Sequence, residues 1–266
     1  EEPKTINLGN ITFSAGVDFT GAYFYRGIAQ ENQQLIVQPW ANLSVKLFES
    51  DECFINSFSI NFGTWNSLHE GPSTDSSGIE WFESDFSAGF SLGLPHNFTF
   101  DFTYISLDGP YDGINFAEEI DIALSYDDSG HWSDHGVGFS GLQPYILFAF
   151  ETNGGSDDGD SEGVYFELGI APSFVVLPNN SFPLTFTLGM TAGFSIDDYY
   201  EDGQGDDDGF GYFLLSPMFS FPINCIPPEF GAWEVSFGAN LMFLGDSAAD
   251  IGGPNSFDVT NGDDFE

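Results

Sequence analysis

The chain has 266 residues, and three Lys and Arg residues against 42 Asp and Glu residues give it a formal net charge of −39. So negative a charge argues against a nucleic-acid partner, because proteins bind phosphates through Lys and Arg. An aromatic content of 17% also excludes a disordered acidic chain, which would contain few aromatic residues. We therefore expect one folded domain over residues 1–266, with its acidic residues concentrated in loops.

The first predicted element is a strand over about residues 10–24, where apolar and polar residues alternate. Ile11, Phe13 and Val17 lie on one face of this strand, and the residues between them are polar or small. After a polar bend, the next strand covers about residues 35–48. A period of two is typical of a strand with one apolar and one polar side. The two strands therefore predict a first hairpin.

Nine further segments continue this alternation to residue 244. In residues 184–195, Leu184, Phe186 and Leu188 share one face, while threonine and glycine occupy the other. Helical periodicity is not sustained anywhere, and Gly and Pro recur too often for helices. The eleven predicted strands cover about residues 10–24, 35–48, 54–65, 79–92, 98–107, 114–126, 137–150, 164–177, 184–195, 210–221 and 232–244.

The connections between these strands alternate in character. Connections on one side, such as residues 151–163 and 197–209, are mostly longer and more acidic than those on the other, such as 49–53 and 93–97. Strands of about ten residues joined in this way are typical of a transmembrane β-barrel. We therefore predict an all-β fold. It is an antiparallel up-and-down transmembrane β-barrel of about twelve strands, eleven of them visible, with short periplasmic turns and long acidic extracellular loops.

The location and the closure of this predicted barrel both remain open. A soluble barrel or sandwich would turn the same apolar face inward, but aromatic residues crowd the strand ends, as the girdle of a membrane barrel requires.

An odd number of strands also leaves the barrel open, because single-chain bacterial barrels close with an even number. Either the closing strand is missing from the chain, or another chain supplies it, or the barrel is not in a membrane. A start at Glu1 without Met suggests a processed product.

The first hairpin carries a resemblance to a known family. It lies in the stretch GVDFTGAYFYRGIAQENQQLIVQPWANLSV, and the similarity extends to NFGTWNS and GPYDGINFAEEIDIALSYD. The stretch resembles the TorF-like porins, which implies an outer-membrane barrel of Gram-negative bacteria more than it implies a solute. The near absence of Lys and the missing last strand depart from the family. The matching residues are Tyr23, Tyr25, Arg26, Gly27, Ile28, Gln30, Gln38 and Pro39.

A barrel of this kind predicts a passive porin rather than an enzyme. A lumen rich in acid and poor in base favours cations and small neutral solutes. We expect Arg26 to point toward the lumen and pair with carboxylates such as Asp18 or Glu31, although an exposed loop charge is the simpler alternative. The residues expected to set the electrostatics of the lumen are Asp18, Arg26, Glu83, Asp85, Asp101, Glu119, Asp121, Glu167 and Glu234.

Two acidic loops suggest weak Ca²⁺ binding, since Ca²⁺ takes six to eight oxygen ligands. Their spacing does not match an EF-hand, so hydrated loops are the alternative. If Ca²⁺ binds, the second functional hypothesis is a cell-surface or extracellular assembly protein, whose open strand edge is completed by a neighbouring subunit. The candidate ligands are Asp157, Asp158, Asp160, Glu162, Asp197, Asp198, Asp202, Asp206, Asp207 and Asp208.

The chain contains two cysteines, Cys53 and Cys225. No Cys/His spacing suggests a zinc site. Both cysteines fall in connections on the same side of the predicted barrel, so a disulfide is possible in an oxidising compartment. Two free thiols are the alternative.

Overall fold

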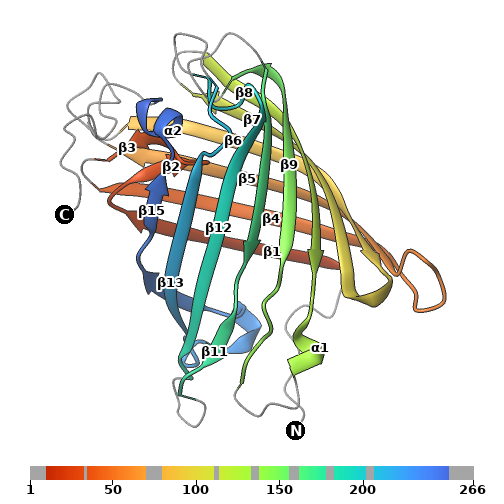
Figure 1. The fold of residues 1–266 in the computed structure, drawn as a ribbon. Coiled ribbons are helices and arrows are strands. Elements are labelled where there is room, and N and C mark those ends of the chain that lie inside the picture. Colours follow the sequence, from red (N-terminus) through yellow and green to blue (C-terminus); the bar gives the residue numbers. More distant parts are fainter. Residues whose placement is uncertain are drawn as a thin grey trace, which may run out of the picture.

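The computed structural model describes residues 10–32, 35–69, 80–110, 114–132, 138–155, 162–177, 183–201 and 207–251. Within these residues the protein is all-β, as predicted, with one antiparallel sheet of 13 strands and a separate two-stranded hairpin (Figure 1). No helix in the described ranges is long and apolar enough to cross a membrane.

The sheet contains β1 (Ile11–Thr20), β4 (Ile36–Glu49), β5 (Ser57–His69), β6 (Glu80–Leu94), β7 (Phe98–Gly109), β8 (Ile114–Tyr126), β9 (Tyr145–Gly154), β10 (Val164–Ile170), β11 (Ser173–Val175), β12 (Thr185–Asp197), β13 (Tyr212–Pro222), β14 (Glu234–Gly238) and β15 (Leu241–Leu244). The separate hairpin consists of β2 (Tyr23–Tyr25) and β3 (Ile28–Glu31). The short helices are α1 (Ser129–Trp132) and α2 (Asp246–Asp250), and 3₁₀ turns cover Pro95–Asn97 and Pro228–Phe230.

The order of strands across the sheet follows the order of the chain. The path runs β1-β4-β5-β6-β7-β8-β9-β10-β12-β13-β14, while β11 and β15 are short additions to β12 and β13. Each strand of this path corresponds to one of the eleven predicted segments. This is a meander, in which each strand of the path pairs antiparallel with the next strand of the path along the chain.

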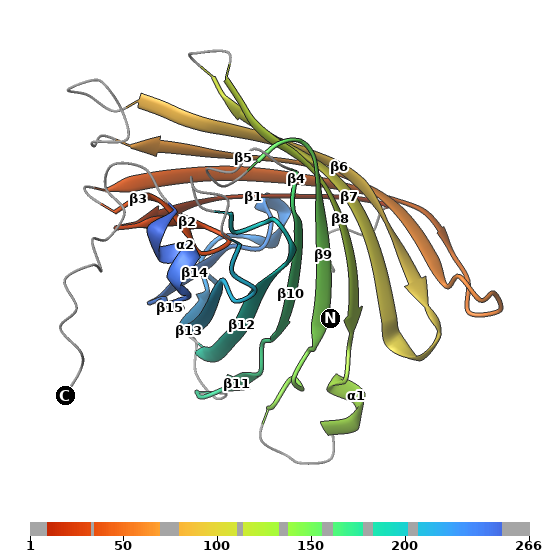
Figure 2. The ribbon, with the colours of Figure 1, turned by 45° about the horizontal axis from the view of Figure 1, so that its top comes forward.

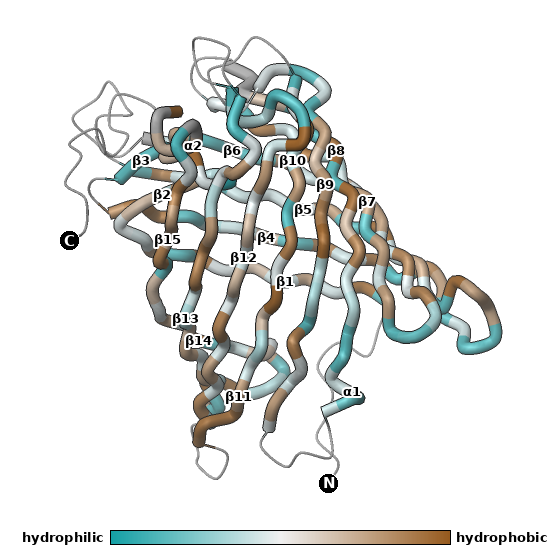
Figure 3. The backbone as a smooth tube through the Cα atoms, in the orientation of Figure 1, coloured by the Kyte–Doolittle hydropathy of each residue, from teal (hydrophilic) through white to brown (hydrophobic). Residues whose placement is uncertain are grey.

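One apolar row crosses the sheet in register. It begins on β1 with Ile11, which lies opposite Val45 on β4. Because opposite residues in a sheet point to the same side, the whole row belongs to one face. The further pairs are Val45–Ile60, Ile60–Phe90, Phe90–Phe102, Phe102–Ile122, Ile122–Phe148, Phe148–Phe166 and Phe166–Phe194. The row therefore continues without a polar residue to β12, and hydropathy alternates along the strands on either side of it (Figure 3).

Burial is inverted relative to a water-soluble core. Among the phenylalanines whose side chains are described, none is buried, whereas Tyr165, Tyr199 and Glu119 are fully buried. The apolar face is exposed, as in Phe13 and Phe19, whose exposed fractions are 65% and 67%. The polar face is therefore the enclosed side of the sheet, and the apolar face points outward.

The sheet curls strongly but does not close. In Figures 1 and 2, β1, β4 and β5 run across the direction of β12 and β13, as the twist of a large sheet requires. In the described part of the chain, β1 and β14 each pair on one side only, so the predicted closed barrel is not formed. Closure needs the first and last strands to pair. Here the last predicted strand is broken into β14 and β15, neither of which offers an edge as long as β1.

The predicted strand boundaries need three further corrections. The first segment ends at Thr20, because the chain then leaves the sheet to form β2 and β3. The segment at 164–177 is divided into β10 and β11, and the segment at 137–150 enters the sheet only at Tyr145. The predicted difference in loop length is also weak, because the side expected to have short turns includes residues 127–144, which contain α1.

Candidate functional site

The hairpin formed by β2 and β3 is the centre of the candidate site. Tyr25 lies opposite Ile28, so Arg26 and Gly27 form a two-residue turn. Both turn residues have positive φ, 44° for Arg26 and 90° for Gly27, which is the requirement of a type I′ hairpin. A Cβ atom on Gly27 would lie 2.7 Å from the ring of Tyr212 on β13, so the turn is closely packed.

This hairpin lies across the polar face of the curled sheet. Tyr23 donates a hydrogen bond of 2.7 Å to Glu83 on β6, and its ring lies 5.1 Å from that of Trp65 on β5. At the turn, Tyr200 donates a 2.7 Å hydrogen bond to the carbonyl oxygen of Arg26. Figure 2 shows β2 and β3 inside the curl, between the β4 and β13 sides. The polar bend that follows the first predicted strand is therefore folded inward.

Arg26 forms ion pairs with two carboxylates of β8. Its Nη2 lies 2.7 Å from Oε2 of Glu119 and 3.1 Å from Oδ1 of Asp121. Nη1 donates a hydrogen bond to the hydroxyl of Tyr199, which in turn donates one to Oε1 of Glu119, and both hydrogen bonds are 3.2 Å long. The predicted ion pair is thus present, but the partners named from the sequence, Asp18 and Glu31, are wrong. Glu119 and Asp121 lie on the same side of β8 because they are two residues apart.

Aromatic rings surround the same guanidinium group. Its Cζ lies 4.6 Å from the ring centroid of Tyr165, 5.2 Å from that of Tyr25 and 5.6 Å from that of Tyr199. These distances fall within the range of cation–π attraction. We call Tyr25, Glu119, Asp121, Tyr165 and Tyr199 the guanidinium cage.

The electrostatics of the hairpin keep Arg26 charged and the tyrosines neutral. Burial by itself lowers the pKa of Arg26, but the surrounding tyrosines and carboxylates raise it, and the net pKa lies well above the ordinary value. Burial raises the pKa of Tyr25 well above 10, with Arg26 opposing and Glu119 adding to the rise. Burial and the adjacent Glu83 likewise raise the pKa of Tyr23. The hairpin therefore places one permanent positive charge among buried acids.

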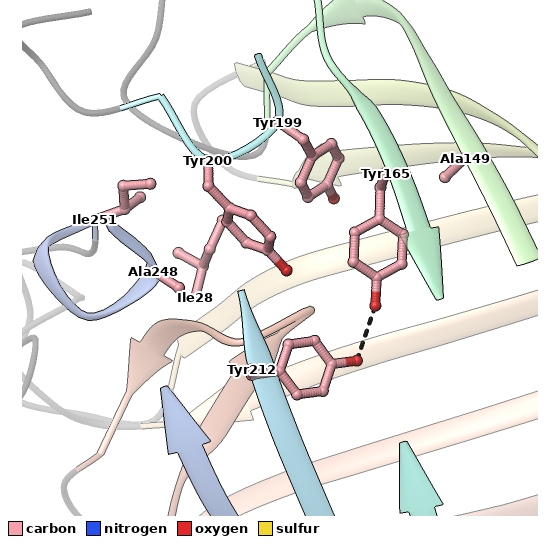
Figure 4. Packing of buried hydrophobic residues seen from close by; sticks show 8 residues of the cluster. All are labelled: Ile28, Ala149, Tyr165, Tyr199, Tyr200, Tyr212, Ala248 and Ile251. Atoms are coloured by element: carbon pink, nitrogen blue, oxygen red, sulfur yellow. Dashed lines mark hydrogen bonds between the residues drawn. The ribbon is translucent and has the colours of Figure 1, made fainter. Parts of the chain in front are cut away.

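A second group of hydrogen bonds, centred on Glu167, shares Tyr165 with the guanidinium cage. Glu167 accepts hydrogen bonds of 2.5 Å from Tyr145 and Tyr165, and one of 2.8 Å from Tyr212. The hydroxyls of Tyr165 and Tyr212 are 2.9 Å apart, as the dashed line in Figure 4 indicates. Glu167 therefore accepts hydrogen bonds from three tyrosine hydroxyls at once.

Apolar packing covers the turn from the other side. Ile28 joins a buried cluster with Tyr200, Ala248 and Ile251, so α2 contributes to the same region (Figure 4). Burial raises the pKa of Tyr200, with Tyr212 as the next contributor. The hairpin is therefore held by packing as well as by charge.

Five of the predicted lumen acids meet around this hairpin, while three do not. Glu83, Glu119, Asp121 and Glu167 take part in the contacts above, and Asp85 interacts with Glu83. In contrast, Asp18 accepts a hydrogen bond from Trp40, Asp101 accepts one from Ser91, and Glu234 is exposed on β14.

The acidic loops are only partly described. Asp157, Asp158, Asp160, Asp202 and Asp206 lie outside the described residues. Glu162, Asp197, Asp198, Asp207 and Asp208 are described, and no group of three or more potential metal ligands occurs among the described residues. One of these acids has a structural contact, since Asp207 accepts a hydrogen bond from the backbone N–H of Tyr200.

Of the two alternatives for the cysteines, the structure has the free thiols and not the disulfide. Cys53 lies between β4 and β5, Cys225 lies between β13 and β14, and both are free, exposed thiols. The two connections belong to opposite halves of the strand order. Sharing one side of the sheet in the topology does not make them neighbours in space.

Sequence reasoning missed the tyrosines and one further polar group. Tyr165 stands two residues before Glu167 on β10, a spacing that puts both side chains on one face, and adjacent tyrosines in an acidic loop were the signal for Tyr199 and Tyr200. The further group is at the end of β5, where Oγ of Ser67 lies 3.2 Å from Nδ1 of His69. Both residues are fully buried, so we assign them no role as nucleophile and base.

Comparisons of the chain with protein-family models, with curated proteins and with solved structures find no match.

Proposed function

We propose that the protein is an outer-membrane, porin-like protein whose sheet lies in lipid and whose enclosed acidic face passes cations or small neutral solutes. The observation that carries this proposal is the unbroken apolar row from Ile11 to Phe194 on the exposed face of the sheet. An outward apolar face and an enclosed polar face are the arrangement of a membrane barrel, the reverse of a soluble one.

The enclosed face supports cation preference. The carboxylates of Glu83, Glu119, Asp121 and Glu167 lie on it, and Arg26 pairs with two of them, Glu119 and Asp121. Acidic linings attract cations and repel anions. The inward hairpin narrows the path at its end of the sheet, which favours small solutes. The resemblance of the first hairpin to the TorF-like porins agrees with this proposal.

The open edges favour a second candidate of a different class. Among the described strands, β1 and β14 lack a partner on one side, and such edges pair readily with another chain. In lipid an unpaired edge leaves backbone groups unsatisfied, at several kcal/mol each. We propose as the alternative a cell-surface assembly in which a second copy completes the edge and the acidic loops bind Ca²⁺ between subunits. Its sheet would be ordered in water by Ca²⁺ rather than by lipid.

The first experiment is membrane extraction with and without detergent, followed by gel migration of heated and unheated samples. The porin proposal requires release only by detergent and a folded form that migrates anomalously. Full extraction in buffer alone would contradict it and would favour the assembly. Planar-bilayer reversal potentials in a salt gradient then test the cation preference.

A matched pair of substitutions sharpens this experiment. Leu43 lies opposite Phe13 and Phe62 on the apolar face, whereas the adjacent Asn42 lies opposite Gly63 on the polar face. In lipid, L43K costs about 2–4 kcal/mol near the bilayer midplane and should reduce the membrane fraction, while N42K should not. In a water-soluble sheet both changes are harmless, because both side chains are exposed. Equal behaviour of the two variants would therefore contradict membrane insertion.

A further inference from the structure

The guanidinium cage has the composition of a ligand site, although its occupant belongs to the same chain. Glu119 and Asp121 come from β8, Tyr165 comes from β10, and Tyr199 follows β12. Only Tyr25 belongs to the hairpin that carries the occupant. The cage therefore has most of its walls on elements that do not depend on Arg26 for their place in the sheet.

The chemistry of the cage selects a guanidinium group over other cations. The side chain of Glu119 has no exposed surface, and that of Asp121 is 11% exposed, so their charges need a partner. Aromatic faces stack well on a planar, weakly hydrated guanidinium and less well on a compact, strongly hydrated ammonium. The hydroxyl of Tyr199 adds an acceptor for one N–H of the occupant.

The occupant sits on a strained turn rather than on a strand. A non-glycine residue at φ 44° is uncommon, and Arg26 has no special preference for that conformation. The energy that keeps it there comes from the cage and from the packing around Tyr200 and Ile28. Arg26 therefore behaves as a tethered ligand held by its side chain.

We propose that the guanidinium cage is a binding site for a small guanidinium-bearing cation, which competes with Arg26 and thereby releases the hairpin from the polar face. The binding part of this proposal stands on the cage alone, and the consequence for solute passage rests on the proposed porin function. A tethered side chain has an effective concentration on the order of millimolar. A free cation must exceed that concentration in the wild-type protein, but not when Arg26 is absent.

The test is chemical rescue in detergent micelles. Arg26→Gly empties the cage and leaves Gly-Gly, a sequence that suits a type I′ turn. Ethylguanidinium chloride at millimolar concentration is the probe, with ethylammonium chloride and sodium chloride as controls, and the Tm is the readout. We expect ethylguanidinium to raise the Tm of Arg26→Gly with saturation, and its apparent dissociation constant to be at least about tenfold lower than in the wild-type protein.

Further variants distinguish loss of the cage contacts from misfolding of one variant. Arg26→Asn also empties the cage, and Asn-Gly is the best sequence for this turn, so it should be rescued in the same way. Lys46→Ala removes a basic residue outside the cage and should show no rescue. Equal effects of ethylguanidinium and ethylammonium, or no saturable rise in either cage variant, would overturn the proposal.

Conductance measured in planar bilayers distinguishes this proposal from the porin proposal. We expect Arg26→Gly to conduct more than the wild-type protein, and ethylguanidinium at high concentration to raise the conductance of the wild-type protein, because it displaces Arg26 from the cage. Rescue of the Tm without conductance in any variant would refute the porin proposal and support the cage. Conductance without rescue of the Tm would support the porin proposal and refute the cage.

Discussion

Arg26 and Lys46 each lie next to a carboxylate, but Arg26 is largely buried in the turn between β2 and β3, while Lys46 is partly exposed on β4. Arg26 is 9% exposed and pairs with Glu119, which has no exposed side-chain surface. Lys46 is 38% exposed and pairs with Glu49, which is 65% exposed, three residues further along β4. Both closest N–O distances are 2.7 Å. The comparison teaches that burial and the number of partners, rather than contact distance, separate a structural ion pair from a surface contact.

The largest expected effect comes from Arg26→Ala. It leaves two buried carboxylates without their cation, which costs about 3–5 kcal/mol of unfolding free energy. The matched change Lys46→Ala should cost at most about 1 kcal/mol, since exposed ion pairs contribute little. Urea unfolding in detergent micelles, followed by tryptophan fluorescence, measures both values. Equal losses would show that the cage does not stabilise the fold.

A smaller effect is expected from Glu119→Gln, which keeps the shape of the side chain but removes its charge. Glu119 contacts Arg26, Tyr25 and Tyr199. Losing hydrogen bonds to a charged group costs about 1.5–3 kcal/mol. Asp101→Asn is the control, because Asp101 contacts Ser91 away from the hairpin. The same urea titration applies, and a Glu119→Gln protein as stable as Asp101→Asn would contradict the cage.

Gly27→Ala tests the turn rather than the charge. Its φ of 90° is unfavourable for alanine, and the new Cβ would meet Tyr212 at 2.7 Å. We expect a loss of about 1–2 kcal/mol from the backbone alone. Gly21→Ala is the control, because a Cβ at Gly21 meets nothing within 4 Å. Tm values of the two variants decide the matter, and a harmless Gly27→Ala would mean that the turn can relax.

The smallest expected effect is a dependence on alkaline pH. Burial raises the pKa values of Tyr23 and Tyr25 in the folded protein, while unfolded tyrosine ionises near pH 10. A raised folded pKa gives stability that is complete below about pH 10 and is lost as the pH rises toward the folded pKa. Absorbance at about 295 nm should show late ionisation of these two residues. Tyr25→Phe should shift the onset of alkaline unfolding upward, and an unchanged onset would argue against its burial.

The fold was largely predictable, because alternation is a local property. Eleven segments of period two give eleven consecutive strands of the sheet. Closure was not predictable in this way, because it depends on whether β1 meets the broken pair β14 and β15. The acids of the cage could be placed on the enclosed face from their spacing on β8. Their pairing with Arg26 could not, because it requires that Thr20 ends the first strand and that the hairpin folds inward.

The consecutive order of the strands has a kinetic consequence. Each strand of the main path pairs with its neighbour in the chain, so the sheet can grow one hairpin at a time with little loop-closure entropy. The contacts of Arg26 are different, since they join residues 95 and 173 positions apart. These contacts require β8 and the residues after β12 to be in place first. We therefore expect the hairpin that carries Arg26 to dock after the sheet has formed around it, although its residues come early in the chain.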